Sequence, residues 1–159
     1  MATQLQYDFF KLLLDEEDRR YSELEARARL YFTVLSFYIG AVAFKLKDLA
    51  EWFEHNRFPL WLAIVGGAIF SGALLFCVLA IQIATYESVN DPRAVASELD
   101  AGVVSDDDFR KARLADFVVA TTRNAKVNDR TASFLAISAM LMLIGVAFQF
   151  VLFAVAIAG

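Results

Sequence analysis

The sequence predicts an all-α membrane protein with three transmembrane helices, of which the first and third continue as long cytosolic helices that form a helical bundle. Two uncharged runs, 58–86 and 131–159, are each longer than the about 20 apolar residues with which a helix crosses a bilayer. The charged segments 4–29 and 106–130, which directly precede the first and last apolar runs, contain no Gly or Pro, which favours helices that enter the membrane unbroken. Apolar residues make up 58% of the chain, and the mean hydropathy is +0.50.

Residues 1–29 are predicted to form a cytosolic amphipathic helix. One of its faces continues into the next apolar run, because residues recur there at alternating steps of four and three, the spacing of a packed helical seam. The seam residues are Phe10, Leu14, Glu17, Tyr21, Leu24, Ala28, Tyr31, Leu35 and Tyr38. We expect Glu17 either to meet a basic partner or to face a wet interior, unless the charged run around it is simply a solvated face.

Residues 30–46 are predicted to be the first transmembrane helix, although the uncharged part spans only about 22 Å. Arg29 and Lys45 flank this run, and their long side chains can reach outward to the lipid headgroups. A segment that only dips into the bilayer is the alternative. Residues 47–57 are then an external loop or an interfacial helix.

Residues 58–86 are predicted to be the second transmembrane helix, and Pro59 suits its first turn. Gly67 and Ser71 stand four residues apart, an arrangement that lets two membrane helices approach closely. We interpret this pair as a helix contact, within or between subunits. A hinge or a constriction is the alternative.

Residues 87–130 are predicted to be a cytosolic helical segment, and residues 131–157 the third transmembrane helix. A short helix should run from Asp91 to Gly102, since Asp caps a helix start and Gly suits its end. Ser105 is followed by three Asp residues, a pattern typical of a second helix start. No Gly or Pro follows before the last span, so this helix should continue into the membrane.

The distribution of Lys and Arg predicts the orientation. Residues 1–29 hold five and residues 87–130 hold seven, whereas three lie between the first two spans and none follows the last. Positive charge stays on the cytoplasmic side of a bacterial inner membrane. We therefore expect a cytoplasmic N-terminus and a periplasmic or external C-terminus.

No pattern in the sequence indicates an enzyme, a cofactor or a metal site. The chain has one histidine, His55, and one cysteine, Cys77, and it lacks a Gly-rich phosphate loop and a nucleophile motif. The three acids at 106–108 are explained by the helix start. Acidic and basic residues are also absent from the middle of the apolar runs, which argues against a proton-coupled or ion-coupled transporter.

Polar residues inside the predicted spans are the candidates for lining a pore. They are Ser36, Ser71, Ser138 and Gln149. Gln149 is the costliest of these to expose to lipid, so it should face another helix, another subunit or a water-filled path. Hydrogen bonding between packed helices is the alternative role for all four.

The cytosolic basic residues fall into two groups. Those far from the membrane are candidates for binding an anionic ligand such as a nucleotide or oligonucleotide, and they are Arg19, Arg20, Arg110, Lys111, Arg113 and Arg123. Those nearest the membrane are expected to anchor on lipid headgroups, and they are Arg27, Arg29, Lys126 and Arg130. Ion pairs with neighbouring acids are the alternative for either group.

Two charged entries into apolar runs carry a resemblance. The run 15–20 leads into 26–30, and the run 124–130 leads into the last span. This layout resembles small bacterial membrane effectors of nucleotide-signalled anti-phage defence, among them the membrane channel component of the Hailong system. The resemblance implies an oligomeric gated pore and a nucleotide or oligonucleotide signal made by a partner enzyme. We expect a homo-oligomer, with a tetramer as the working assumption, because three spans cannot enclose a wet path alone. A non-conducting regulatory subunit that tethers a cytosolic partner is the alternative.

Overall fold

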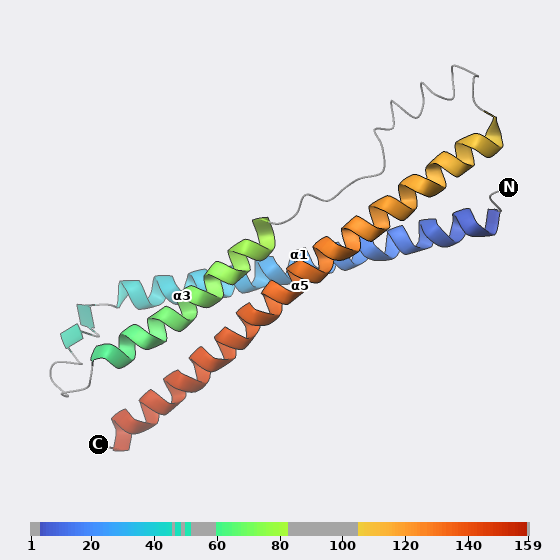
Figure 1. Ribbon diagram of the computed structural model, residues 1–159. Helices are drawn as coiled ribbons and strands as arrows, with labels where there is room; N and C mark the ends of the chain where they lie inside the picture. Colours follow the sequence, from blue (N-terminus) through green and yellow to red (C-terminus); the bar gives the residue numbers. More distant parts are fainter. Residues whose placement is uncertain (1–3, 46, 49, 52–59, 83–104, 159) are drawn as a thin grey trace. The chain divides into compact units, whose positions relative to one another are not determined.

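The computed structural model describes residues 4–45, 47–48, 50–51, 60–82 and 105–158, which contain three long helices (Figure 1). They are α1 (Gln4–Phe44), α3 (Leu60–Gln82) and α5 (Asp106–Ala158). The chain divides into two compact units. We call Met1–Leu24 with Ala84–Arg130 the polar unit, and Glu25–Ile83 with Thr131–Gly159 the apolar unit. Helices α1 and α5 contribute residues to both.

Helix α5 begins at a capped N-terminus. The backbone N–H of Asp108 donates to Ser105 Oγ at 3.3 Å, the Ser105 hydroxyl donates to Asp108 Oδ2 at 2.8 Å, and the Phe109 N–H donates to the Ser105 carbonyl at 2.9 Å. These bonds satisfy donors that a helix start otherwise leaves unpaired. The predicted unbroken helix from Ser105 into the last apolar run is confirmed. The predicted helix from Asp91 to Gly102 lies outside the described residues.

Helix α1 follows the predicted seam. All nine seam residues are buried or half-buried, and Ala28 and Leu35 are 1% and 0% exposed. The alternating steps of four and three therefore mark the packed face of this helix, as expected for a heptad-like contact. Of the predicted segment 47–57, residues 47, 48, 50 and 51 are helical and the others lie outside the described residues.

Two helical segments are long and apolar enough to cross a membrane. One is Trp61–Gln82 in α3, and the other lies within Asp107–Ala154 of α5. The all-helical architecture is thus confirmed. Of the three predicted spans, only the second and third contain a described helix that is long and apolar enough to cross a membrane. The first apolar run occupies the last turns of α1 and holds 15 uncharged residues up to Phe44, so its crossing, extended by the flanking Arg29 and Lys45, stays a prediction.

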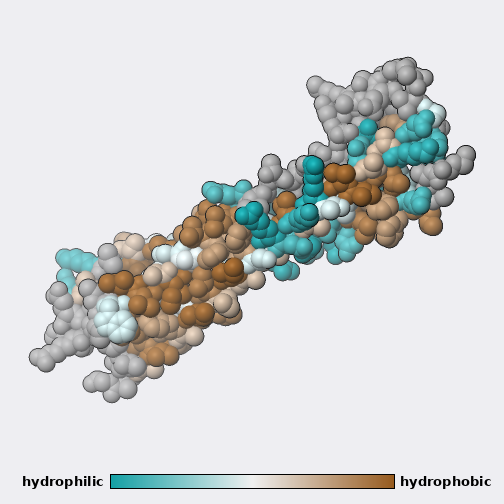
Figure 2. Space-filling view, in the orientation of Figure 1, coloured by the Kyte–Doolittle hydropathy of each residue, from teal (hydrophilic) through white to brown (hydrophobic). Residues whose placement is uncertain are grey.

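On the face shown in Figure 2, hydrophobic side chains predominate over the apolar unit, whereas most of the hydrophilic side chains lie on the polar unit. The core of the apolar unit is a cluster of Leu35, Phe70, Ala73 and Cys77, with Tyr31, Tyr38, Leu74, Leu141 and Met142 packed against it. Cys77 Sγ donates to the Ala28 carbonyl at 3.1 Å, and Phe76 packs on Phe134 with ring centroids 5.9 Å apart. All three helices therefore meet in this core.

Candidate functional site

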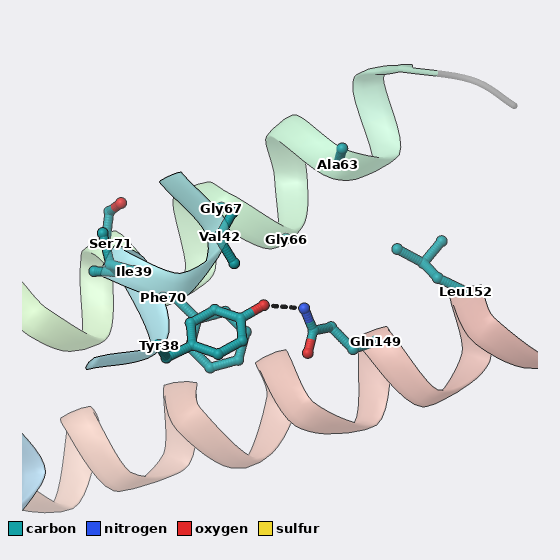
Figure 3. A pocket seen from close by; sticks show the side chains of 10 residues that line it. All are labelled: Tyr38, Ile39, Val42, Ala63, Gly66, Gly67, Phe70, Ser71, Gln149 and Leu152. Atoms are coloured by element: carbon teal, nitrogen blue, oxygen red, sulfur yellow. Dashed lines mark hydrogen bonds between the residues drawn. The ribbon is translucent and has the colours of Figure 1, made fainter. Parts of the chain in front are cut away.

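A polar pair lies beside a cavity in the apolar unit (Figure 3). The Gln149 side-chain amide of α5 donates a hydrogen bond to the Tyr38 hydroxyl of α1. The Tyr38 ring packs against Phe70 of α3, with centroids 4.2 Å apart and planes inclined by 34°. The adjacent cavity has a volume of about 220 Å³, and Gly67 and Ser71 also line it. One polar group from each of two helices therefore meets at this point.

Two features of the sequence position Tyr38 and Phe70 beside the cavity. Tyr38 belongs to the seam of α1, which turns it toward the other helices. Phe70 can approach α5 because Gly145 stands opposite, where a Cβ atom would come within 2.8 Å of the ring. The absence of a side chain at Gly145 therefore sets how closely α3 and α5 pack around the cavity.

Gln149 stays exposed although it bonds to Tyr38. It also borders a second, shallower depression of about 290 Å³ with Val146, Phe150 and Phe153. A primary amide has two donor hydrogens and a carbonyl acceptor, and a lipid chain offers a partner to none of them. If this part of α5 lies in a membrane, an exposed Gln among apolar side chains is favourable only beside another protein surface or beside water.

The other predicted pore candidates occupy different environments. Ser138 is fully buried, and its hydroxyl donates to the Ala73 carbonyl at 2.8 Å, so it serves the packing of α5 against α3. Ser36 and Ser71 are exposed. A Cβ atom on Gly67 would meet no atom within 4 Å among the described residues, so the Gly67–Ser71 pair makes no close helix contact within the part of the chain that the structure shows. The contact between subunits stays a prediction.

In the polar unit, the seam residue Glu17 contacts Asn128 of α5 and Arg20 of its own helix. The Asn128 side-chain amide donates to the Glu17 carboxylate at 2.6 Å and to the Glu17 carbonyl at 3.0 Å. Arg20 lies 3.7 Å from the same carboxylate and binds Asp129 at 2.7 Å. Of the alternatives open for Glu17, a basic partner is the one that the structure shows, with Asn128 as an additional donor. Asn128 is 0% exposed. Its contact with Glu17 was not predicted from the sequence, because the spacing of apolar residues does not reveal which polar residues of α5 are buried.

Several of the candidate anion-binding residues contact acids of their own chain. Arg19 lies 3.4 Å from Glu23, Arg20 binds Asp129, Lys111 lies 2.8 Å from Asp107, and Arg113 lies 3.3 Å from Asp116. The hydrogen bond to Asp129 raises the pKa of Arg20, and the hydrogen bond to Asp107 raises the pKa of Lys111.

Arg113 is additionally buried, and its guanidinium lies 5.5 Å from the centroid of the Phe109 ring. These internal contacts make Arg113 the least accessible of the six. Arg110 and Arg123 are exposed. Of the predicted headgroup anchors, Arg29 lies 2.6 Å from Glu25, while Arg27, Lys126 and Arg130 are exposed.

Within the described residues, no group of three or more His, Cys, Asp or Glu side chains is placed to hold a metal ion. His55 lies outside them. Comparison of the chain with protein-family models, curated proteins and solved structures found no match. Its function must therefore be argued from its own residues.

Proposed function

We propose that this chain is an oligomeric inner-membrane effector whose helices form a gated ion-conducting pore. An anionic nucleotide or oligonucleotide on the cytosolic helices controls the pore, and anti-phage defence is the setting that the resemblance implies. The observation that carries the proposal is the hydrogen bond between the exposed Gln149 and the half-buried Tyr38 beside a cavity, among helices with apolar surfaces.

The pair supports a pore because of its surroundings. Polar side chains inside a membrane are retained where they face protein or water. In the single chain, α1, α3 and α5 pack on one core of the apolar unit. Three spans are too few to enclose a wet path alone, so the proposed conducting path lies between chains, where Gln149 and Ser71 can line it.

The basic side chains of α5 support control by an anion. Arg110 and Arg123 are exposed in the polar unit, and guanidinium groups bind phosphate through paired hydrogen bonds. Ligand binding can shift a pore between two states only if it favours one packing of the helices over the other. Helices α1 and α5 each continue from one unit into the other. A change in how they pack in one unit can therefore be transmitted along the helices to the other unit.

The experiment is an ion-flux assay on the purified protein in liposomes, with a nucleoside triphosphate or a short single-stranded oligonucleotide as the probe. We expect flux in the wild type, its loss in Gln149→Leu, and its retention in the matched variant Met140→Leu, which changes an exposed apolar residue of the same helix. We expect the double variant with Arg110→Glu and Arg123→Glu to conduct ions but not to respond to the probe. Absence of flux under every condition contradicts the pore and favours the non-conducting tether.

A further inference from the structure

The polar unit carries large apolar side chains on an outer face of α1. Leu5, Phe9 and Leu12 are 80%, 54% and 64% exposed, and Glu16 continues their row at steps of four, three and four. We call these four residues the α1 outer stripe. At 100° per residue, this row lies about 140° around the helix from the seam that packs within the chain. Exposed apolar rows of this kind mark interaction surfaces on a charged unit.

Helix α5 presents a second row with the same spacing. Ala115, Val119, Thr122 and Lys126 are all exposed, and we call them the α5 outer stripe. Its first three members are smaller than their counterparts on α1. The Thr122 hydroxyl donates to the Val118 carbonyl at 2.7 Å, so it needs no external acceptor when it is covered.

The two stripes stand at the same level along the polar unit. Tyr7 packs on Phe117 with centroids 5.2 Å apart, and Glu17 bonds to Asn128, so α1 and α5 run parallel here. These contacts join residues 110 and 111 positions apart. Each member of the α1 outer stripe precedes its counterpart on the α5 outer stripe by 110 positions. Each pair of counterparts therefore lies at one height, on faces turned away from the shared seam.

The two helices carry opposite net charge over the polar unit. Residues 4–24 of α1 hold three bases and six acids, a balance of −3. Residues 106–130 of α5 hold six bases and five acids, a balance of +1. Complementary charge of this kind favours the meeting of the two faces.

We propose that the α1 outer stripe of one copy packs on the α5 outer stripe of the next copy. Leu5, Phe9 and Leu12 cover the smaller residues, and Glu16 pairs with Lys126, in addition to or instead of the headgroup contact expected for that lysine. Because two different faces meet, the contact is heterologous, and repeating it by rotation about one axis closes the copies into a ring. The two stripes lie at the same height, so neighbouring copies are related by this rotation without a shift along the helices. This interface deepens the proposed function, which rests on an oligomer.

The test is oxidative cross-linking in membranes, in a Cys77→Ser background that removes the single cysteine of the sequence. Phe9→Cys with Val119→Cys should give a ladder of disulfide-linked species that stops at the number of subunits in the ring. Each single variant is the matched control and should give no dimer, whereas mixing the two should give one dimer. A dimer from Phe9→Cys alone means a two-fold contact between identical faces and overturns the proposal.

Charge reversal supplies a second readout. Glu16→Lys should lower the cross-linking yield about two- to fivefold, the range for an exposed ion pair, and adding Lys126→Glu should restore it. Absence of a ladder overturns the interface. Slow labelling of both cysteines by a soluble thiol reagent then means that another part of the same chain covers the stripes, and fast labelling means that they face solvent. A ladder without ion flux in liposomes upholds the interface and contradicts the pore, while flux without a ladder does the reverse.

Discussion

Replacing Gly145 by Ala should destabilise the apolar unit through one identifiable clash. The added Cβ atom would lie 2.8 Å from Phe70 Cε2 and Cζ, and 3.2 Å from Cδ2. The ring has little room to move, because Phe70 is buried and packs against Tyr38 at 4.2 Å. Such overpacking costs about 1–3 kcal/mol. Gly67→Ala is the matched control, since a Cβ atom there meets nothing within 4 Å among the described residues.

Both substitutions gain the same helix propensity, so their difference isolates the clash. The assay is reversible unfolding in mixed detergent micelles, followed by circular dichroism. We expect Gly145→Ala to be about 1–3 kcal/mol less stable than Gly67→Ala. Adding Phe70→Leu should recover part of that loss, because the shorter side chain vacates the contact. Equal stability of the two alanine variants would refute the close packing of α3 on α5 at Gly145.

Three further predictions concern polar contacts. Asn128→Ala should cost about 1.5–3 kcal/mol in the same assay, because it removes a hydrogen bond to the Glu17 carboxylate. Asn128→Asp should be worse at neutral pH, because it sets a second carboxylate against that of Glu17. Ser138→Ala should cost about 0.6 kcal/mol, the average for a hydrogen bond between membrane helices, whereas Ser138→Leu should disrupt folding because the site is fully buried. The contact with Asp107 raises the pKa of Lys111, so its stabilisation is complete below the ordinary value of 10.5 and is lost as pH rises through the higher folded value. An alkaline titration of wild type against Lys111→Gln checks this sign, and a difference confined to acid pH would contradict it.

The seam of α1 and the start of α5 could be predicted because their signals are local. Apolar spacing marks Phe10 to Tyr38, and a capping pattern marks Ser105. The packed face of α5 could not be read in the same way, because several of its buried residues are polar. They are Arg113, Asn124, Asn128, Thr131 and Ser138. A search for apolar periodicity passes over them.

The small residues show a different limit. In the sequence, Gly67 and Ser71 form a pair of small residues four apart, whereas Gly145 has no small residue four positions away. The structure shows that Gly145 is the one that faces a ring, while a Cβ atom on Gly67 would meet nothing within 4 Å among the described residues. The ion pairs also differ in whether the sequence can predict them. Arg19 and Glu23 are neighbours on one helix turn, whereas the Arg20–Asp129 pair joins residues 109 positions apart and depends on the fold.

The central claim is that α1 and α5 stand in the cytosol over their charged parts while the uncharged helices are embedded in the membrane. Thiol labelling in bacterial cells tests it, with single cysteines at the exposed positions Arg19, Arg110 and Asp48 in a Cys77→Ser background. A membrane-impermeant reagent should label position 48 in cells with a permeabilised outer membrane, and positions 19 and 110 only after the inner membrane is opened. Labelling of positions 19 and 110 from opposite sides, or recovery of the chain in the soluble fraction without detergent, would contradict the account.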